Sequence, residues 1–344
     1  MMHVTRRTNM SPLREASSFT TSPRWTFAAI CACMLALPVW AAGQSAPETT
    51  ASGGTTAKTF DSPQAAVDAL LDAADKYDVS ALEAILGPEA DDIIHTGEPA
   101  RDKKTAADFV AKAREKKEIA TDAKTPDRAV LVIGAEDWSF SVPIVKNGNK
   151  WFFDSKAGLQ EILYRRIGGN ELDAIQICRG YVEAQDEYAV VKHGDTGVAE
   201  YAQRIISTPG KQDGLAWQNP DGTWGGPIGE RIAQIIEQGY AKGNPYHGYF
   251  FKVLKGQGPA APLGRMDYVV KGVMIGGFAL AAAPAEYRVT GVKTFIVSND
   301  GVVYEKDLGP KTLEAFKNMD VFNPDPTWHP VESPPGDEPT AAQS

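Results

Sequence analysis

Cysteine is scarce in this chain of 344 residues, and its placement excludes several kinds of site. Cys31 and Cys33 lie in an apolar segment near the start, so Cys178 alone serves the rest of the chain. A single cysteine forms no intrachain disulfide and supplies no thiolate cluster for structural zinc. Cys178 sits among apolar residues at helical spacing, which indicates a packed core thiol without a nucleophilic role.

A concentrated basic patch is also missing, which argues against nucleic acid as a partner. The formal net charge of −9 repels the phosphates of nucleic acids and anionic lipids. The densest basic run, Lys112–Lys117, is typical of a solvated helix face. We therefore expect no nucleic-acid partner.

Long apolar runs are few, and the clearest one lies near the start of the chain. Four arginines precede the run from Trp25 to Trp40, which ends in small residues. This order is typical of a secretory signal peptide, and the run is too short to span a bilayer comfortably. We predict a signal peptide over residues 1–42, a periplasmic or secreted protein, and no stable membrane span after its removal.

Motifs for catalysis and cofactor binding are absent as well. The sequence has no Gly-x-Ser-x-Gly nucleophile, no His-Glu-x-x-His metal motif and no glycine loop in a βαβ unit. Asp91, Asp92 and His95 could bind a metal together only if they lay on one side of a helix. The glycines that flank them favour a loop instead. We predict no catalytic residue, no metal and no cofactor.

Two segments have the composition of disordered chain. Residues 43–59 are rich in Ser, Thr, Gly and Ala without apolar periodicity, which predicts a flexible linker. Residues 318–344 carry many prolines, which predicts a disordered tail.

Residues 60–164 are predicted to form an α+β domain. Ser62 and Asp78 are placed to cap two helices, and Thr105 is placed to open a third. A period-two pattern follows, and Asn147-Gly148 is typical of a tight hairpin. Helices followed by a curved antiparallel sheet resemble the cone shared by nuclear transport factor 2-like and ketosteroid isomerase-like domains.

Residues 165–317 are predicted to form a second domain, a long helix packed on an antiparallel sheet. Gly168-Gly169 predicts a chain break, with Asn170 as the cap of a helix whose apolar stripe continues to Tyr188. The pattern then predicts a short helix over Gly197–Ser207, a loop over Lys211–Gly229, a helix over Ile228–Tyr240, and glycine-rich strands after residue 248. The predicted fold class of the whole chain is α+β.

The loop Lys211–Gly229 carries the strongest candidate binding residues: Trp217, Asn219, Asp221 and Trp224. Two indoles beside amide and carboxylate groups suit stacking on sugar rings or clamping of a peptide. The alternative is that both tryptophans pack inward on the sheet. His247, flanked by aromatic residues and glycine, is a further candidate for ligand binding or for a structural hydrogen bond.

Several short motifs of the second half resemble the globular head of type IV pilin-like proteins. They are a helix with Ala-Gln-x-x-Tyr at Ala184–Tyr188, Gly248-Tyr249, Ala283-Pro284 and a closing Phe-x-Val-x-x-Asp-Gly-Val hairpin at Phe295–Val302. The stretch before the helix is polar and follows another domain, so the apolar polymerisation segment of a pilin is missing.

Longer runs across Phe60–Leu308 resemble a bacterial family of exported proteins, domain of unknown function 2950. The matching runs are Phe60–Pro63, Ile85–Gly87, Val145–Asp154, Arg165–Leu172, Pro245–Tyr249 and Phe295–Val297. The resemblance implies that the protein is exported, but it implies no particular enzymatic reaction.

These observations favour an exported, non-enzymatic module for binding or assembly in the cell envelope, with a polysaccharide or a protein as partner. Two alternatives remain open. One is a periplasmic enzyme acting on a cell-wall polymer or small molecule, with His247 or Glu136 in the reaction. The other is a subunit associated with a pilus or pseudopilus.

Overall fold

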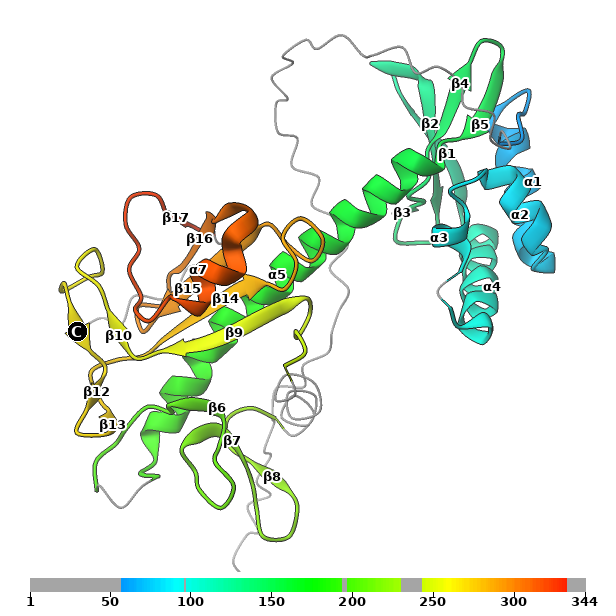
Figure 1. The fold of residues 1–344 in the computed structure, drawn as a ribbon. Helices are drawn as coiled ribbons and strands as arrows, with labels where there is room; N and C mark the ends of the chain where they lie inside the picture. The colour runs from blue at the N-terminus through cyan, green and yellow to red at the C-terminus, as the bar shows by residue number, and fades with distance from the viewer. Residues whose placement is uncertain (1–56, 96, 194–196, 230–242, 333–344) are drawn as a thin grey trace, which may run out of the picture.

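The computed structural model describes residues 57–95, 97–193, 197–229 and 243–332. In Figure 1 two lobes stand apart and are joined by the long helix α5 (Ser155–Val190). One hydrophobic core gathers residues between Phe60 and Phe153, and a second gathers residues between Ala174 and Trp328. We call the parts on either side of α5 the N-lobe (residues 57–154) and the C-lobe (residues 197–332). The predicted α+β class is confirmed.

The helices of the N-lobe begin where local capping groups allow. Ser62 Oγ accepts from the amide of Ala65 at the start of α1 (Pro63–Lys76), and Asp78 does the same for α2 (Val79–Leu86). The short α3 (Asp91–Ile94) forms where we predicted a loop. The prediction that Thr105 opens a helix is wrong, because α4 (Pro99–Glu115) already begins at a proline, whose fixed φ suits the first turn.

An antiparallel sheet covers the N-lobe helices. It contains β1 (Lys117–Asp122), β2 (Thr125–Ile133), β3 (Trp138–Ser139), β4 (Ile144–Asn147) and β5 (Lys150–Phe153), in the order β1-β2-β4-β5 with β3 also on β2. The predicted hairpin at Asn147-Gly148 is confirmed, with Gly148 at a φ of 59°. We did not predict β1, because its side chains are almost all exposed and show no apolar alternation.

Helix α5 runs without interruption from the N-lobe into the C-lobe. Asp154 caps its start by accepting from the amide of Ala157 at 3.0 Å. The predicted break at Gly168-Gly169 is therefore wrong, and the helix crosses the predicted boundary between residues 164 and 165. Asn170 is not a cap; its amide donates to Thr290 O at 2.8 Å. With 36 residues, α5 is about 54 Å long.

The main sheet of the C-lobe packs against the second half of α5. Its antiparallel strands are β9 (Tyr249–Leu254), β14 (Ala279–Pro284), β15 (Lys293–Ser298), β16 (Val303–Asp307) and β17 (His329–Pro330), in the order β17-β16-β15-β14-β9. Both α5 and α7 (Thr312–Lys317), which follows the 3-10 turn η2 (Gly309–Lys311), contact β14. Every residue of β14 is buried.

Smaller strands complete the C-lobe. β6 (Arg204–Ile206) runs parallel to β7 (Gly214–Gln218), which pairs with β8 (Trp224–Gly225). Two further pairs are β10 (Gly256–Gln257) with β11 (Met266–Asp267), and β12 (Val269–Val270) with β13 (Val273–Met274).

Three predictions about the C-lobe need correction. The helix predicted over Gly197–Ser207 and the loop predicted over Lys211–Gly229 contain β6, β7 and β8 instead. The disordered tail predicted from residue 318 is wrong as far as residue 332, because Phe322 and Trp328 are buried and β17 joins the sheet. The signal peptide, most of the linker, residues 333–344 and most of the helix predicted over Ile228–Tyr240 lie outside the described residues.

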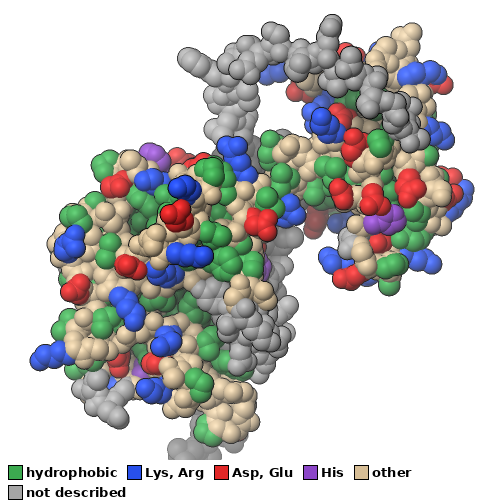
Figure 2. Space-filling view, viewed as in Figure 1, with side chains coloured by type: hydrophobic (Ala, Val, Ile, Leu, Met, Phe, Trp, Pro, Cys, Tyr) green, Lys and Arg blue, Asp and Glu red, His purple; other side chains and the backbone are tan. Residues whose placement is uncertain are grey.

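Acidic and basic side chains alternate over both lobes. Figure 2 shows Lys and Arg interspersed with Asp and Glu on the face in view. Several of them form exposed pairs, such as Arg114 with Asp75 and Lys117 with Asp68, each at 2.8 Å. Within the described part of the chain, no helix is long and apolar enough to cross a membrane.

Candidate binding cleft

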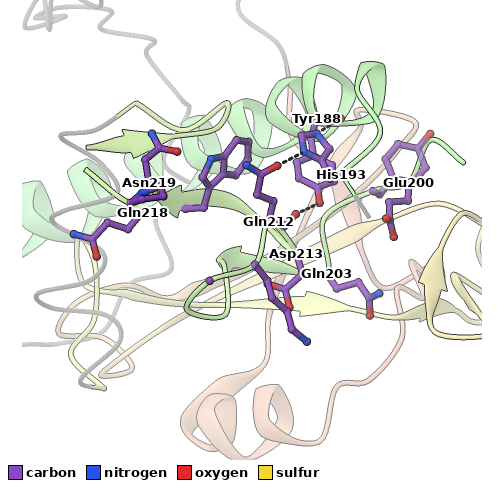
Figure 3. A pocket seen from close by; sticks show the side chains of 13 residues that line it. Tyr188, His193, Glu200, Gln203, Gln212, Asp213, Gln218 and Asn219 are labelled. Carbon is purple, nitrogen blue, oxygen red and sulfur yellow. Dashed lines mark hydrogen bonds between the residues drawn. The ribbon is translucent and has the colours of Figure 1, made fainter. Parts of the chain in front are cut away.

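A cleft of about 800 Å³ lies at the C-lobe, between the last turn of α5, the segment that precedes β6, and β7 with the turn before it (Figure 3). Aromatic, amide and charged side chains share its lining. The aromatic residues are Tyr188, Tyr201 and Trp217, with His193; the amides are Gln203, Gln212, Gln218 and Asn219; the charged residues are Glu200, Lys211 and Asp213. Of the residues that we predicted to bind a ligand, Trp217 and Asn219 lie here.

A stacked pair of rings forms one wall of the cleft. The rings of Tyr188 and His193 are parallel within 16°, with their centres 3.8 Å apart. His193 Nε2 lies 2.9 Å from the carbonyl oxygen of Tyr188, which assigns the proton to Nε2. Because α5 ends at Val190, the Tyr188 carbonyl belongs to the last turn of the helix, where it also accepts from the amide of Val191 at 3.3 Å. The helix terminus thus fixes the orientation of the ring.

The phenol of Tyr188 is held as a neutral donor. Its hydroxyl donates to the carbonyl oxygen of Gln212. Burial, followed by the charges of Glu200 and Asp213, raises the pKa of Tyr188 well above its ordinary value. The hydroxyl therefore keeps its proton at neutral pH and ties α5 to the segment that leads into β7.

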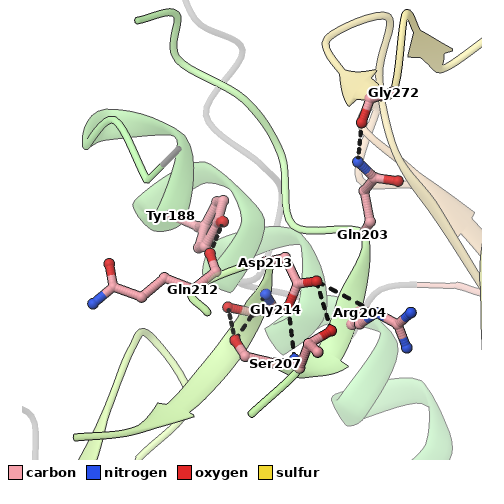
Figure 4. A network of polar contacts seen from close by, with 9 residues as sticks. Tyr188, Gln203, Arg204, Ser207, Gln212, Asp213, Gly214 and Gly272 are labelled. Carbon is pink, nitrogen blue, oxygen red and sulfur yellow. Dashed lines mark hydrogen bonds and ion pairs between the residues drawn. The ribbon is translucent and has the colours of Figure 1, made fainter. Parts of the chain in front are cut away.

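Asp213, which lines the cleft, is the centre of a network of polar contacts (Figure 4). Its carboxylate accepts from the amide of Thr208 at 2.7 Å and from the Thr208 hydroxyl at 2.8 Å, and Arg204 Nε lies 3.6 Å away. Burial opposes ionisation of Asp213, but the bonds from Thr208 and the charge of Arg204 outweigh it and lower its pKa. The ionised carboxylate consequently fixes the turn between β6 and β7.

A buried glutamine fastens the cleft to α5. Gln185 is fully buried, and its amide both donates to and accepts from the backbone of Ala202, each at 2.8 Å. It also donates to the hydroxyl of Tyr181 at 2.8 Å. The segment that carries Glu200, Tyr201 and Gln203 is therefore anchored to the same helix as Tyr188.

Trp217 is positioned by the glycine that faces it across the hairpin. Trp217 of β7 pairs with Gly225 of β8, and a Cβ on Gly225 would lie 2.6 Å from Trp217 Nε1. The indole therefore rests directly on the backbone at Gly225. Its ring also lies 5.4 Å from that of His193, at an angle of 58°. Trp217, half-buried, thus continues the aromatic wall begun by Tyr188 and His193.

Trp224 lies on the other face of the hairpin. It pairs with Gln218, the neighbour of Trp217 on β7. Successive side chains of a strand point to opposite faces, and directly paired residues share a face. The two tryptophans therefore form no common platform. Trp224 does not line the cleft, although Gln218, its partner on the same face, does.

Asn219 and Asp221 stabilise the hairpin turn. The amide of Asn219 donates to the hydroxyl of Thr223 at 3.0 Å. Asp221 accepts from the amide of Thr223 at 3.0 Å and from its hydroxyl at 2.7 Å, and these bonds lower the pKa of Asp221. The polar residues that we interpreted as ligand contacts thus hold the turn that presents Trp217.

His247 belongs to a different part of the C-lobe. Its Nδ1 lies 2.5 Å from Asp173 Oδ2, and its ring packs edge-on against Tyr246. Asp173 and Tyr188 are both on α5, separated by roughly 22 Å along the helix axis. His247 therefore takes no part in the cleft, and its contact with Asp173 ties α5 to the start of β9.

The described residues contain no cluster of three or more side chains suited to a metal ion. His95 lies 3.8 Å from Asp91, four residues earlier on the helical α3, and 3.7 Å from Glu83 of α2, but Asp92 does not join them.

A model of the family described as "Protein of unknown function (DUF2950)" matches residues 57–331. The chain belongs to the DUF2950 family. The predicted family membership is thereby confirmed. Neither the curated proteins nor the solved structures include a match to this chain.

Two of the motifs that resembled the DUF2950 family meet where α5 joins the sheet. Besides the contact of Asn170 with Thr290, Glu171 accepts from the amides of Val292 and Lys293 at 2.8 and 3.0 Å. Gly248 is needed here, because a Cβ would lie 2.5 Å from the Asn170 amide nitrogen. In this DUF2950 protein these motif residues hold the fold together.

Sequence reasoning missed most of the residues that line the cleft. Tyr188 was recognised as part of the apolar stripe of α5 and of the Ala-Gln-x-x-Tyr motif, but not as a ligand contact. His193, Glu200, Gln212 and Asp213 stand in short polar segments without a motif. The parallel pairing of β6 with β7 and the bonds of Gln185 and Tyr188 to distant backbone bring them together, and no local pattern predicts these contacts.

Proposed function

We propose that this DUF2950 protein is an exported, non-enzymatic module of the cell envelope whose C-lobe cleft binds a segment of polysaccharide. The observation that carries the proposal is the aromatic wall of Tyr188, His193 and Trp217 beside a group of side-chain amides. Rigid aromatic rings provide apolar faces for the C–H surface of a sugar, and amides pair with its hydroxyl groups. The volume of the cleft falls in the range common for ligand sites.

The bonding of the cleft residues supports binding over catalysis. Asp213 is held by Thr208 and Arg204, and both Tyr188 and His193 are bonded to backbone carbonyls. A general acid or base needs a proton that it can exchange with the substrate. Because Asp213, Tyr188 and His193 already have such partners, we infer that they hold the binding surface of the cleft in place.

The two tryptophans of the hairpin give a matched test. Purified mature protein is incubated with insoluble peptidoglycan and with exopolysaccharide, and the bound fraction is measured against concentration. Trp217→Ala should weaken binding by about 30-fold, the loss typical of a central aromatic contact. Trp224→Ala, on the opposite face, should bind as the wild type does.

Equal binding by the wild type and Trp217→Ala would refute the role of the cleft. Release of soluble fragments from peptidoglycan, abolished by His247→Ala, would favour the enzyme alternative. The export step is tested separately by the intact mass of protein recovered from the periplasm or medium. Its first residue should lie between Ala41 and Ser45.

A further inference from the structure

Helix α5 contains a pair of glycines that its packing does not require. Gly168 and Gly169 lie in the interior of the helix, and a Cβ on either one would meet nothing within 4 Å. Neither has the positive φ that favours glycine. Elsewhere on the same helix Gly158 is required, because a Cβ there would lie 2.7 Å from Val142 Cγ2. Glycine is the weakest helix former after proline, so the pair locally weakens α5.

The N-lobe holds α5 up to Arg165. Its guanidinium donates to the carbonyl oxygen of Ser139 at 2.7 Å and to the Ser139 hydroxyl at 2.9 Å. The same side chain bonds Glu161 one turn earlier at 2.8 Å. Together with the close packing of Gly158 on Val142, these contacts make the first part of α5 a component of the N-lobe.

The C-lobe holds α5 from Asn170 onward. Asn170 bonds Thr290, Glu171 bonds two successive backbone amides, and Asp173 bonds His247. The apolar stripe that starts at Ala174 then packs into the core of the C-lobe. From residue 170 on, α5 therefore belongs to the C-lobe.

We propose that α5 is a hinge, bending at Gly168-Gly169 so that the two lobes change their relative orientation. Between the last anchor in the N-lobe and the first in the C-lobe lie only residues 166–169, and the glycines occupy half of this stretch. Kinks in helices concentrate at such residues, and hinge motion is absorbed by a few positions between rigid bodies. Each lobe keeps its own core, so bending disrupts neither.

Single-molecule energy transfer between the lobes tests the hinge in the full mature chain. Dyes are attached to Lys103→Cys on α4 and Lys317→Cys on α7, both exposed positions. Cys178 is buried and stays unlabelled. The wild-type background should give a broad distribution of transfer efficiency. Gly168→Ala with Gly169→Ala should narrow it to one sharp peak, because alanine stiffens the helix without a clash.

Gly180→Ala provides the matched control. Gly180 lies on the same helix, and a Cβ there also meets nothing within 4 Å. It is inside the part of α5 that packs on the C-lobe, so the substitution should leave the broad distribution unchanged. The hinge is refuted if the wild-type background already gives one sharp peak, or if Gly180→Ala narrows the distribution as much as the double substitution. Neither result depends on polysaccharide binding.

Discussion

The substitution Gly225→Ala tests how the cleft holds its aromatic wall. The added Cβ would lie 2.6 Å from Trp217 Nε1 and 3.0 Å from Trp217 Cε2. Both distances are shorter than ordinary van der Waals contact, so the indole has to leave its place over the strand. Trp217 also packs on the core of the C-lobe. Overpacking of this kind costs about 1–3 kcal/mol of unfolding free energy.

Urea unfolding of the mature protein measures this loss. Gly225→Ala should lower the midpoint without changing the slope of the transition, because the unfolded surface stays the same. Gly229→Ala is the control, since a Cβ at Gly229 meets nothing within 4 Å. The control should stay within about 0.5 kcal/mol of the wild type.

Gly225→Ala and Gly229→Ala also test whether the position of the Trp217 indole affects polysaccharide binding. Displacing the indole should weaken polysaccharide binding by Gly225→Ala in the folded protein, whereas Gly229→Ala should bind normally. If Gly225→Ala matches its control in both stability and binding, Trp217 is not held on the hairpin backbone, and the reasoning about the cleft fails.

Three further predictions concern the buried Cys178 of α5 and the ionised Asp213 of the C-lobe. Burial raises the pKa of the Cys178 thiol to about 12, so a thiol reagent should label the native protein slowly at mildly alkaline pH, and rapid labelling would contradict the packing. Cys178→Ser should lower the unfolding free energy by about 1–3 kcal/mol in urea titrations, because it buries a hydroxyl without an assured partner. The pKa of Asp213 is below the ordinary 3.8, so its stabilising effect is present above that pH and is lost as pH falls through the folded-state pKa. Melting curves from pH 7 to strongly acidic pH should therefore show the difference between wild type and Asp213→Asn shrinking below about pH 4, and a difference that grows there would show the opposite sign.

Local signals predicted the elements whose structure depends on neighbouring residues. Ser62 and Asp78 cap their helices through bonds to amides three residues ahead, so the capping pattern in the sequence was sufficient. The hairpin at Asn147-Gly148 needs only a residue that accepts positive φ. The strands β14, β15 and β16 lie in the region after residue 248 where strands were predicted.

Local signals misled us where distant contacts decide the outcome. We interpreted Gly168-Gly169 as a break, yet α5 continues through it, between the contact of Arg165 with Ser139 and that of Asn170 with Thr290. The prolines after residue 318 predicted a disordered tail, yet Phe322 and Trp328 are buried in the core. In both cases the stabilising partners are far away in the sequence and leave no trace in the local pattern.

The sequence alone was enough to predict the α+β class, the caps at Ser62 and Asp78, the tight hairpin and the membership of the DUF2950 family, because these rest on short-range bonding or on directly comparable residues. Only the tertiary structure decided which of the candidate residues meet. It placed Trp217 with Tyr188 and His193, turned Trp224 to the opposite face, and paired His247 with Asp173 elsewhere. The physical reason is that strand register and the course of α5 are fixed by the packing of whole elements, and these two choices set which side chains share a surface.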